Sequence, residues 1–508
     1  MKTTLNELHL QLKASIEQFI RGEISAADLK HDAAPFGIYQ QRNKLFMLRV
    51  RVAGGHITPP QLRNLAKLVE QHNGGHVHLS SRQDIQLHDI AADNIYDAIH
   101  QCSEEGLPFK GGGGNTYRNI LMSPNSGFAN EPVAFDVLPY ITALNSFMME
   151  HEHAFELPRK YKIGIFASKS EHGNALLQDL GLIATRRDGV QGFEVYGGGG
   201  MGRYSALAVK LFDFIPAGDF IRCAVAMNEL FYDHGNRENR NKARIRFILK
   251  DLGEEKFVEL FQQYFADAEA FSNKLPLELN TPELKLKEFA SQNATAEFSA
   301  WHEHAAVASH NDNNVAMTTI YVPHGNLTAT QLIKLANLAE QFKSPFFRLT
   351  QQQNMVLPLH RSALPYFYAA LGDEFPELDL QLKSFKGNLT CCVGATVCKI
   401  GILDSPTMAD KIATELDKLL PLGAPNRNQL LKPIITGIKI SGCPNACSAH
   451  VAAAIGIQGQ KAKIDGNLTD VWKIFSSKDD QLGTSDDKLF KTAELPAAIC
   501  QRLLALNK

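Results

Sequence analysis

The sequence predicts an α+β protein made of two related halves with pseudo-two-fold symmetry, and three observations lead to this prediction. Residues 55–87 and 325–357 align at a constant offset of 270 positions without a gap, and 12 of the 33 aligned pairs are identical. Chance would give only about two identities at ordinary composition. Each copy has the order β-α-β-β, which is compatible with a small ferredoxin-like half. Five of the eight cysteines then follow in residues 391–447, after the second copy alone.

The elements of each copy follow from local sequence patterns. An alternating apolar run at residues 45–52, and again at residues 316–322, predicts the first strand. Thr58 and Thr328 are then expected to cap a helix at its N-terminus. The second strand is expected at residues 77–79 in the first copy and at residues 346–349 in the second. The third strand is expected around Ile85 and Leu87 in the first copy, and around Met355 and Leu357 in the second.

The length of 508 residues is sufficient for several domains. We divide the chain into an N-terminal helix with the first ferredoxin-like half-domain (1–105), a first cofactor domain (106–300), the second half-domain (301–372) and a cysteine-bearing domain (373–508).

Charge and hydropathy exclude several classes of function. The net charge is −2 with no basic block, so we expect no nucleic-acid partner. No apolar run approaches the roughly 20 residues that a membrane-spanning helix needs. Residues 1–20 have helical apolar spacing with charges between, unlike a signal peptide, so we expect a cytoplasmic protein without a membrane partner.

Four cysteines have the spacing of a metal cluster. Five residues separate Cys392 from Cys398, and three separate Cys443 from Cys447. Structural zinc sites usually have two-residue gaps in both pairs, so zinc fits poorly. Irregular gaps suit the corners of a cubane iron–sulfur cluster, and the alternative is a set of buried free thiols. Cys391 adjoins Cys392, and we treat it as a spare cysteine.

Two glycine-rich segments and one basic segment lie between the copies. Residues 111–115 and 197–202 could bring backbone N–H groups close to an anionic ligand, or could be ordinary loops. Neither has a dinucleotide-binding pattern. The basic residues of segment 235–247 could form a solvated helix face or bind cofactor carboxylates.

These residues together resemble the sirohaem-dependent sulfite and nitrite reductases. The resemblance covers roughly residues 35–460, and the last fifty residues are not placed by it. It rests on five motifs: TCCVGATVC at 390–398, SGCPNAC at 441–447, SSRQ at 80–83, NTYRN at 115–119 and LPRKYK at 157–162. The second of these is the most specific signature of the family, and an internal duplication is also typical of it.

The resemblance implies the duplicated sulfite/nitrite reductase fold, with ferredoxin-like half-domains and domains for sirohaem and a [4Fe-4S] cluster. Cys447 is implied as the ligand shared by both cofactors, with Cys392, Cys398 and Cys443 on the remaining irons. The expected sirohaem-binding residues are Asn115, Arg118, Arg244, Gln353, Asn445 and Cys447, with the 197–200 backbone.

Four basic residues are implied to hold the substrate anion and supply protons. They are Arg82, Arg118, Lys160 and Lys162. A strand over residues 160–166 would place Lys160 and Lys162 on one face. Arginine stays protonated, whereas lysine changes its pKa readily and can pass protons.

The implied activity is the six-electron, assimilatory-type reduction of sulfite to sulfide, and the alternative is reduction of nitrite to ammonia. A lysine at both positions of Lys-x-Lys favours sulfite in this family, whereas asparagine at the second position favours nitrite. A cluster protein without catalytic activity would explain the cysteines but not the basic motifs. Because no flavin domain or extra ferredoxin is visible in the sequence, we expect a separate donor, either ferredoxin or a flavoprotein reductase.

Overall fold

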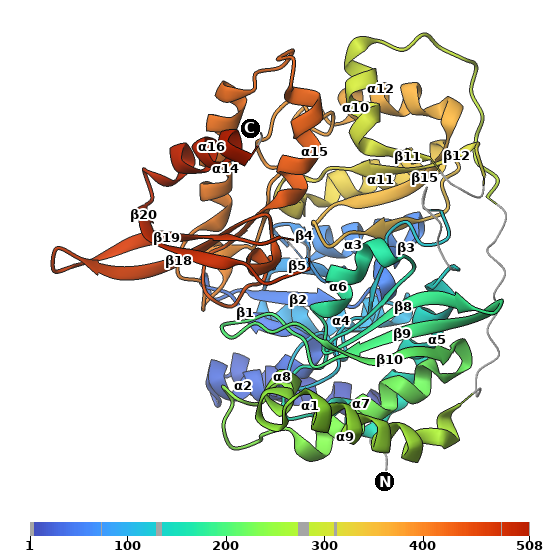
Figure 1. Cartoon of the computed structure of the whole chain (residues 1–508), viewed down its shortest axis with the longest axis vertical. Coiled ribbons are helices and arrows are strands. Elements are labelled where there is room, and N and C mark those ends of the chain that lie inside the picture. Colours follow the sequence, from blue (N-terminus) through green and yellow to red (C-terminus); the bar gives the residue numbers. More distant parts are fainter. Residues whose placement is uncertain are drawn as a thin grey trace.

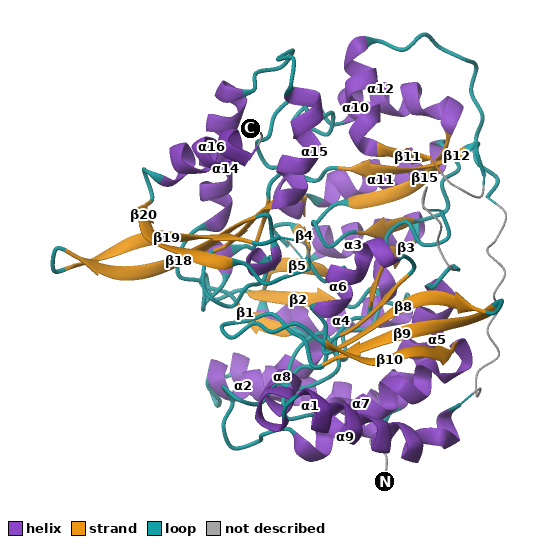
Figure 2. Cartoon of the chain, in the orientation of Figure 1, coloured by secondary structure: helices purple, strands orange, loops and turns teal. Residues whose placement is uncertain are grey.

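The computed structural model describes residues 5–72, 74–128, 135–272, 284–308, 312–478 and 480–506. Its strands form four five-stranded sheets, with helices packed around them (Figures 1 and 2). In the view of Figure 1 the N-terminus lies at the bottom of the molecule and the C-terminus near the top.

The first half-domain has the sheet order β1-β2-β5-β4-β13. Its strands are β1 (Ile38–Gln40), β2 (Phe46–Val50), β4 (Val77–Leu79), β5 (Ile85–Ile90) and β13 (Asn326–Leu327). The helices of this part of the chain are α1 (Leu5–Ile20), α2 (Ala26–Ala33), α3 (Pro59–Gln71) and α4 (Ile95–Glu104).

The second half-domain has the matching order β11-β12-β15-β14-β3. Its strands are β11 (Ala306–Ala308), β12 (Val315–Ile320), β14 (Phe347–Leu349), β15 (Met355–His360) and β3 (His56–Ile57). Its helices are α10 (Ala296–Ala305), α11 (Ala329–Gln341) and α12 (Leu364–Glu374). The predicted duplicated α+β fold is therefore present, with α3 and α11 at the same offset of 270 residues.

Each half-domain lends one short strand to the other. The strand β3 pairs with β14, with Ile57 opposite Phe347, and β13 pairs with β4, with Leu327 opposite Val77. Before each exchanged strand the chain makes a tight turn with positive φ, and its last residue is Gly55 or Gly325. A Cβ on Gly55 would lie 3.0 Å from the Leu349 carbonyl oxygen, so the close crossing of the two copies requires glycine there.

The two copies of the helix begin in the same way and pack against each other. The side chain of Thr58 accepts a hydrogen bond from the Gln61 backbone N–H, and Thr328 does the same with Gln331, so each helix has a capping box and the predicted caps are confirmed. Across the pair, Arg63 donates to a Glu340 carboxylate oxygen at 2.7 Å.

The two remaining sheets share one mixed pattern, which extends the pseudo-symmetry beyond the half-domains. In both sheets two parallel pairings are followed by two antiparallel ones. The first contains β6 (Leu121–Met122), β7 (Ile163–Phe166), β8 (Leu180–Arg187), β9 (Val190–Gly197) and β10 (Val209–Pro216). The second contains β16 (Thr390–Cys391), β17 (Ile438–Ser441), β18 (Ile455–Ile464), β19 (Asn467–Ser476) and β20 (Thr484–Lys491).

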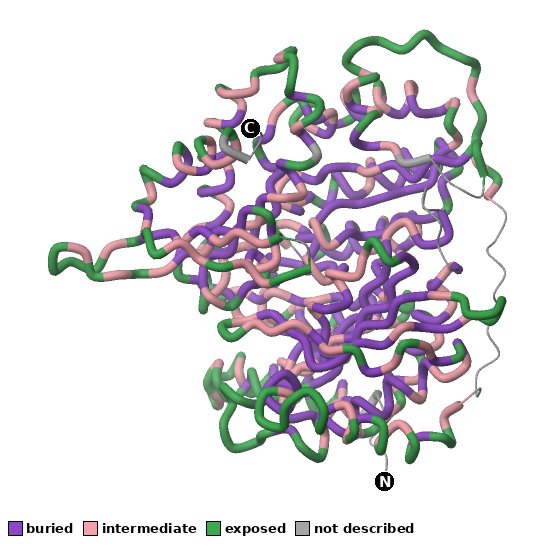
Figure 3. Tube along the Cα trace, viewed as in Figure 1, coloured by how far each residue is buried: buried purple, intermediate pink, exposed green. Residues whose placement is uncertain are grey.

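Helices cover both of these sheets. Those of the first are α5 (Leu138–Glu150), α6 (His172–Leu176), α7 (Phe220–His234), α8 (Ile245–Leu252) and α9 (Glu254–Asp267), and those of the second are α13 (Gly394–Val397), α14 (Ser405–Leu419), α15 (Arg427–Gly437) and α16 (Leu495–Leu506). One continuous apolar core joins both half-domains to the sheet of β16–β20. A separate apolar core surrounds the sheet of β6–β10. Figure 3 shows buried chain through the middle of the molecule and an exposed tip on the projecting hairpin β18–β19.

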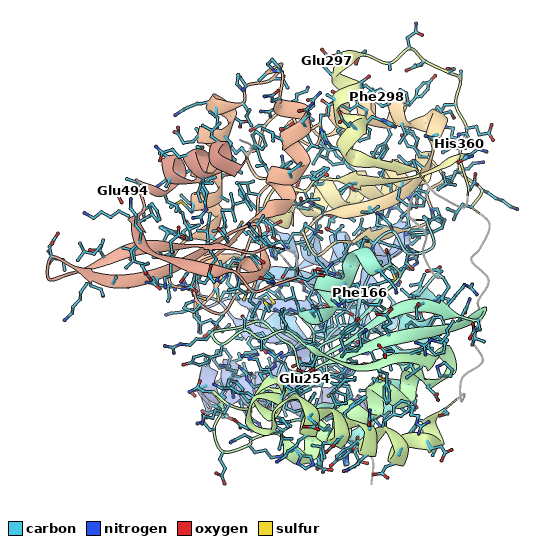
Figure 4. The ribbon with its side chains drawn as sticks, viewed as in Figure 1. Phe166, Glu254, Glu297, Phe298, His360 and Glu494 are labelled. Carbon is cyan, nitrogen blue, oxygen red and sulfur yellow. The ribbon has the colours of Figure 1, made fainter. Side chains whose placement is uncertain are left out.

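Two local expectations need correction. The strand expected over residues 160–166 begins only at Ile163, and before it Tyr161 forms a single parallel bridge with Tyr117. Phe166, at the end of β7, is labelled in the middle of the molecule in Figure 4. The basic segment 235–247 is not one solvated helix face, because α8 begins at Ile245 and Arg244 and Arg246 are both buried.

Among the described residues, no helix is long and apolar enough to cross a membrane.

Candidate active site

The two cysteine motifs lie at the ends of two neighbouring parallel strands. Cys392 follows β16, and Cys443 and Cys447 follow β17, which is the next strand of that sheet. Parallel strands end at the same sheet edge, so this topology brings the motifs together. The Cys447 thiol is close enough to Cys392, Cys398 and Cys443 to influence the pKa of each.

Tight backbone packing holds the cysteine loops against each other. The Gly442 backbone N–H donates to the Cys392 sulfur at 3.3 Å, and the Ser405 hydroxyl lies 3.2 Å from that sulfur. A Cβ on Gly394 would lie 2.5 Å from the Ser405 oxygen, so glycine is needed at this contact, as its φ of 53° also indicates. Burial, and then Cys447, raise the pKa of Cys392 to about 11.

The arrangement fits a cluster better than a single ion. Within the described ranges, no group of three or more cysteine, histidine or acidic side chains is arranged to hold one metal ion. A tetrahedral zinc site needs its ligands around one point, whereas the thiolates of a cubane are separated by the whole cluster. Cys447 influences each of the other three thiols, and four thiols linked in this way fit the wider spacing of a [4Fe-4S] cluster.

The remaining three motifs are joined by backbone hydrogen bonds. Leu157 N–H donates to the Asn115 carbonyl at 3.1 Å, and Arg118 N–H donates to the Tyr161 carbonyl at 2.7 Å. These bonds place Arg118 beside Lys160 and Lys162. The Ser81 hydroxyl donates to the Cys447 carbonyl at 2.8 Å and so joins the first half-domain to the cysteine loop.

The two lysines are half-buried and lie among other cations. Burial, followed by Arg244, lowers the pKa of Lys160 to about 7, and the nearby Cys447 thiol opposes this shift. Burial and then Lys160 lower the pKa of Lys162 well below its usual value. The coupling to Cys447 is the observation that joins the basic residues to the cysteine site.

The cluster of cations lacks matching negative charge. Its described members are Arg49, Arg82, Arg118, Arg159, Lys160, Lys162, Arg244 and Arg246, and they lie near two buried carboxylates, Asp84 and Asp179. Arg118, Arg244 and Arg246 are buried and the other five are half-buried, and enclosing so many cations is costly unless anions accompany them. The site therefore fits a cofactor rich in carboxylates together with an anionic substrate.

Arg82 lies in this cluster, but its hydrogen bonds are made within the protein. One nitrogen donates to Gln178 at 3.0 Å, and another donates to the carbonyls of Asn119 at 2.7 Å and Ile163 at 2.9 Å. These contacts tie three motifs together. They leave Arg82 less free to bind a substrate than the sequence motif suggests.

The predicted cofactor-binding residues fall into two groups. Asn115, Asn445 and Cys447 are exposed to solvent. Arg244 is buried and pairs with Asp179 at 2.8 Å, and Gln353 is buried with its amide nitrogen 3.1 Å from a His78 ring nitrogen. The first group is available for a ligand, whereas the second is engaged with protein groups.

Two residues at the site were missed in the sequence, Arg49 and Tyr39. Arg49 lies on β2, and its buried Nε has no hydrogen-bond partner. Although burial opposes the shift, Arg118 and Arg49 lower the pKa of Tyr39, and its phenol oxygen accepts the Gly114 N–H at 3.0 Å. A charged residue within the alternating apolar run at 45–52 was the available signal for Arg49.

Cys391 belongs to a different network from its neighbour Cys392. Its sulfur lies 3.6 Å from His324 Nδ1, and His324 Nε2 lies 3.0 Å from an Asp410 carboxylate oxygen. Cys391 is buried on the side of the second half-domain. These contacts agree with its treatment as a spare cysteine.

Known proteins of two activities resemble this chain. An assimilatory ferredoxin-dependent nitrite reductase from Haloferax mediterranei is 27% identical over 86% of this chain and 75% of its own length. A protein named sulfite reductase [ferredoxin] 2 from Mycolicibacterium paratuberculosis is 26% identical over 86% of this chain and 77% of its own. The solved structure of the Mycobacterium tuberculosis NirA protein shares the fold, with a TM-score of 0.77, 23% identity, and coverage of 98% of this chain and 92% of that one.

Fold and site together define a class of oxidoreductases built from two ferredoxin-like half-domains and a cofactor-bearing body. The family model for the nitrite/sulfite reductase ferredoxin-like half domain matches residues 39–102 and 309–373, and the nitrite and sulphite reductase 4Fe-4S domain matches residues 113–268. The chain belongs to the nitrite and sulfite reductase family, whose members carry sirohaem and a [4Fe-4S] cluster.

Proposed function

We propose that this protein reduces sulfite to sulfide, using six electrons delivered one at a time. The observation that supports this most directly is the position of two half-buried lysines, of which Lys160 lies near the Cys447 thiol and Lys162 lies beside Lys160. We assign Cys392, Cys398, Cys443 and Cys447 to the cluster, with Cys447 shared with the sirohaem iron. Asn115, Asn445 and the basic residues around Arg244 would hold the sirohaem.

When bound, the sirohaem and the cluster would supply the electrons for the reduction, and the protein's own residues would supply charge and protons. Arg118 and Arg49 hold the anion, because a guanidinium keeps its charge throughout. Lys160 and Lys162 donate protons to the departing oxygen atoms, which leave as water, and a lysine with a lowered pKa gives up a proton readily. Arg82 keeps the three motifs in place through its contacts with Asn119 and Ile163.

The alternative is reduction of nitrite to ammonia by the same centre. Relatives of similar identity carry both names, so the choice depends on Lys162. Two lysines favour the doubly charged sulfite, whereas nitrite carries a single charge and needs less positive charge around it.

The electron donor is proposed to be a ferredoxin. The names of both relatives support this, since each includes ferredoxin. A flavoprotein reductase remains the second candidate. We further propose a cytoplasmic location and the four-domain division at residues 105, 300 and 372.

The proposal is tested on one purified sample. Its optical spectrum should show the Soret and red-region bands of sirohaem, because a bare cluster gives only a broad shoulder. With reduced methyl viologen as the donor, kcat/KM should be higher for sulfite than for nitrite. A sample without sirohaem bands after reconstitution would contradict the proposal, and a preference for nitrite would select the alternative.

The variant Lys162→Asn tests the substrate assignment directly. Removing a general acid typically costs about 10² to 10⁴ in rate, so sulfite turnover should fall severely while haem content stays normal. Nitrite reduction should fall less. Lys256→Asn is the matched control, because Lys256 is exposed on α9, outside the proposed site. An equal loss for both ions would remove the argument for sulfite.

A further inference from the structure

Asp179 is a fully buried acidic residue that belongs to none of the five motifs. It directly precedes β8, whose Leu180 pairs with Ile163 at the start of the parallel strand β7. The Leu180 N–H donates to the Lys162 carbonyl at 3.1 Å, so Asp179 lies beside Lys162, just before the two strands begin to pair. The Lys162 N–H therefore needs a hydrogen-bond partner from outside the paired strands.

The Asp179 carboxylate supplies that partner and binds a second group at the same time. Its Oδ2 accepts the Lys162 backbone N–H at 2.9 Å and an N–H from Nη2 of Arg244 at 2.8 Å. Its Oδ1 accepts from the same Arg244 nitrogen at 2.9 Å and from Nε at 3.3 Å. A carboxylate that binds a guanidinium through two nitrogens fixes the orientation of both groups. One side chain thus fixes Lys162 and Arg244 relative to each other.

The backbone at Asp179 also reaches the glycine-rich segment 197–202. The Asp179 carbonyl accepts the Gly198 N–H at 3.0 Å. A Cβ on Gly200 would lie 2.7 Å from an Arg244 nitrogen, so this segment lies against the guanidinium. The lysine motif, the glycine-rich segment and Arg244 therefore meet at Asp179, although they are far apart in the sequence.

The charge of Asp179 acts on the proton donors of the site. Burial is the largest cause of the lowered pKa of Lys162, and the Asp179 carboxylate opposes this shift. It opposes the same effect of burial on the pKa of Arg82. The carboxylate of Asp84 acts in this way on Arg118, which is proposed to hold the anion. Asp179 is therefore the carboxylate that favours the ammonium form of Lys162.

We propose that Asp179 is a positioning residue of the reduction, which holds Lys162 in the orientation that delivers protons to the substrate. This inference rests on the proposed function, because it assumes that Lys162 is a proton donor. Both oxygens of Asp179 are engaged by protein N–H groups, so Asp179 acts through Lys162 and not on the substrate. A reacting group displaced by about 1 Å can lose a factor of about 10² in rate.

Asp179→Asn tests the proposal on the holoenzyme, because it keeps the shape of the side chain and removes its charge. With reduced methyl viologen as the donor, kcat for sulfite per haem should fall about 10- to 100-fold. KM for sulfite should stay the same or fall, because removing a negative charge does not weaken the binding of an anion by Arg118. A general disturbance of the site would instead raise KM.

A double-mutant cycle tests whether Asp179 acts through Lys162. In a Lys162→Asn background, the additional change Asp179→Asn should lower kcat by less than about threefold, because the group that Asp179 positions is already absent. If Asp179→Asn does not fold, Asp179→Glu takes its place in the same cycle. It keeps the charge but displaces the carboxylate, so its effect on kcat should also depend on Lys162.

Asp417→Asn is the matched control. Asp417, on α14, makes the same kinds of contact outside the proposed site. It pairs with the buried Arg427 at 3.2 Å and accepts the Phe385 backbone N–H at 3.1 Å. Its replacement should lower the thermal unfolding midpoint, as Asp179→Asn does, but leave kcat and KM for sulfite unchanged.

Three results would overturn the proposal. The first is a kcat in Asp179→Asn within about threefold of the wild type, a change too small for a displaced reacting group. The second is an equal loss with and without Lys162, and the third is an equal fall of kcat in Asp417→Asn.

Failure of the proposed function would be recognised separately, because the wild type would then reduce neither ion. Acetylation of lysines followed by mass spectrometry would still test Asp179. Asp179→Asn should speed the acetylation of Lys162 relative to the exposed Lys256, because an amine without the carboxylate beside it is more often neutral. An unchanged ratio would show that Asp179 does not act on Lys162.

Discussion

At the scale of single residues, the proposed site depends on lysines whose charge follows their surroundings. Lys160 and Lys162 are half-buried beside arginines, and both effects favour the neutral amine. An anionic cofactor and substrate would favour the ammonium instead. In the proposed function each lysine would therefore be charged while an anion is bound and would become neutral as the anion loses charge.

This balance predicts a pH dependence. A lysine donor is active below its pKa, and bound anions raise the pKa of Lys160 above the value of about 7 that it has without them. Sulfite kcat/KM should therefore fall as pH rises through a value above 7. In Lys160→Arg the decline should vanish from the measurable range, because arginine stays protonated, while the rate at pH 7 falls by about 10² or more. A pH profile identical to that of the wild type would remove Lys160 from proton transfer.

Two adjacent cysteines differ sharply in their surroundings. Cys392 lies near Cys447, whereas Cys391 faces His324. Cys447→Ser should abolish activity and disturb the spectra of both cofactors. Cys391→Ser should retain most activity and normal spectra, because serine keeps a hydrogen-bonding group near His324. Normal spectra in an active Cys447→Ser protein would refute the shared-ligand assignment.

The sequence identified site residues where a motif placed them together, and missed those that only the fold brings in. Lys160, Arg118 and Cys447 come from motifs and do lie close together. Arg49 and Tyr39 come from β2 and β1, and nothing in local spacing relates them to Arg118. For Arg82 the motif identified the residue correctly but could not show its hydrogen-bond partners, which lie within the protein.

At the scale of elements, the glycine-rich segment 111–115 acts as a close-packed support for Asn115 and Arg118. The Arg118 guanidinium donates to the Gly114 carbonyl at 2.6 Å. A Cβ on Gly113 would lie 2.5 Å from the Tyr39 hydroxyl and would also collide with the Ala34 carbonyl oxygen. The glycines of segment 111–115 thus allow the backbone of this segment and the Tyr39 side chain to approach each other closely.

Gly113→Ala should therefore displace this segment. Overpacking typically costs about 1 to 3 kcal/mol, and the shift of Asn115 and Arg118 should lower sirohaem content and raise KM for sulfite. Gly437→Ala is the control, because a Cβ there has its nearest neighbour at 3.6 Å. Thermal unfolding and haem quantification on both variants check the prediction. Equal haem content and KM in both would show that the segment tolerates a side chain.

The predicted strands and helices of the repeat were found close to their expected positions, whereas the segment before β7 was not. Helix caps and alternation are local signals, and both act within the two copies. Residues 160–162 alternate like a strand, but their pairing partners are the irregular residues 116–118, and only one bridge forms. Whether such a segment forms a strand is decided by its pairing partners in the fold and not by its own sequence pattern.

At the scale of the whole molecule, the two half-domains are one folding unit. Each contributes a strand to the sheet of the other, and one apolar core continues through both into the cysteine-bearing sheet. A change in an exchanged strand should therefore weaken both halves together.

Ile57→Ala tests this cooperativity. Ile57 is fully buried in β3, and truncating a buried isoleucine costs about 2 to 5 kcal/mol. The denaturation midpoint should fall equally by circular dichroism and by fluorescence of Trp301, a buried residue of α10 in the other half, measured in a Trp472→Phe background so that Trp301 is the remaining tryptophan. Ile20→Ala, at a position 47% exposed, should change little. Unequal shifts of the two signals would show that the halves unfold separately.

The exchanged strands also constrain how such a chain can evolve. A duplicated gene can normally be split again between its copies, and each product folds alone. Here a cut between the copies would leave each product one edge strand short, with an unpaired row of backbone groups available for aggregation. The exchange therefore keeps the cysteine loops of one copy and the basic residues of the other in a single chain.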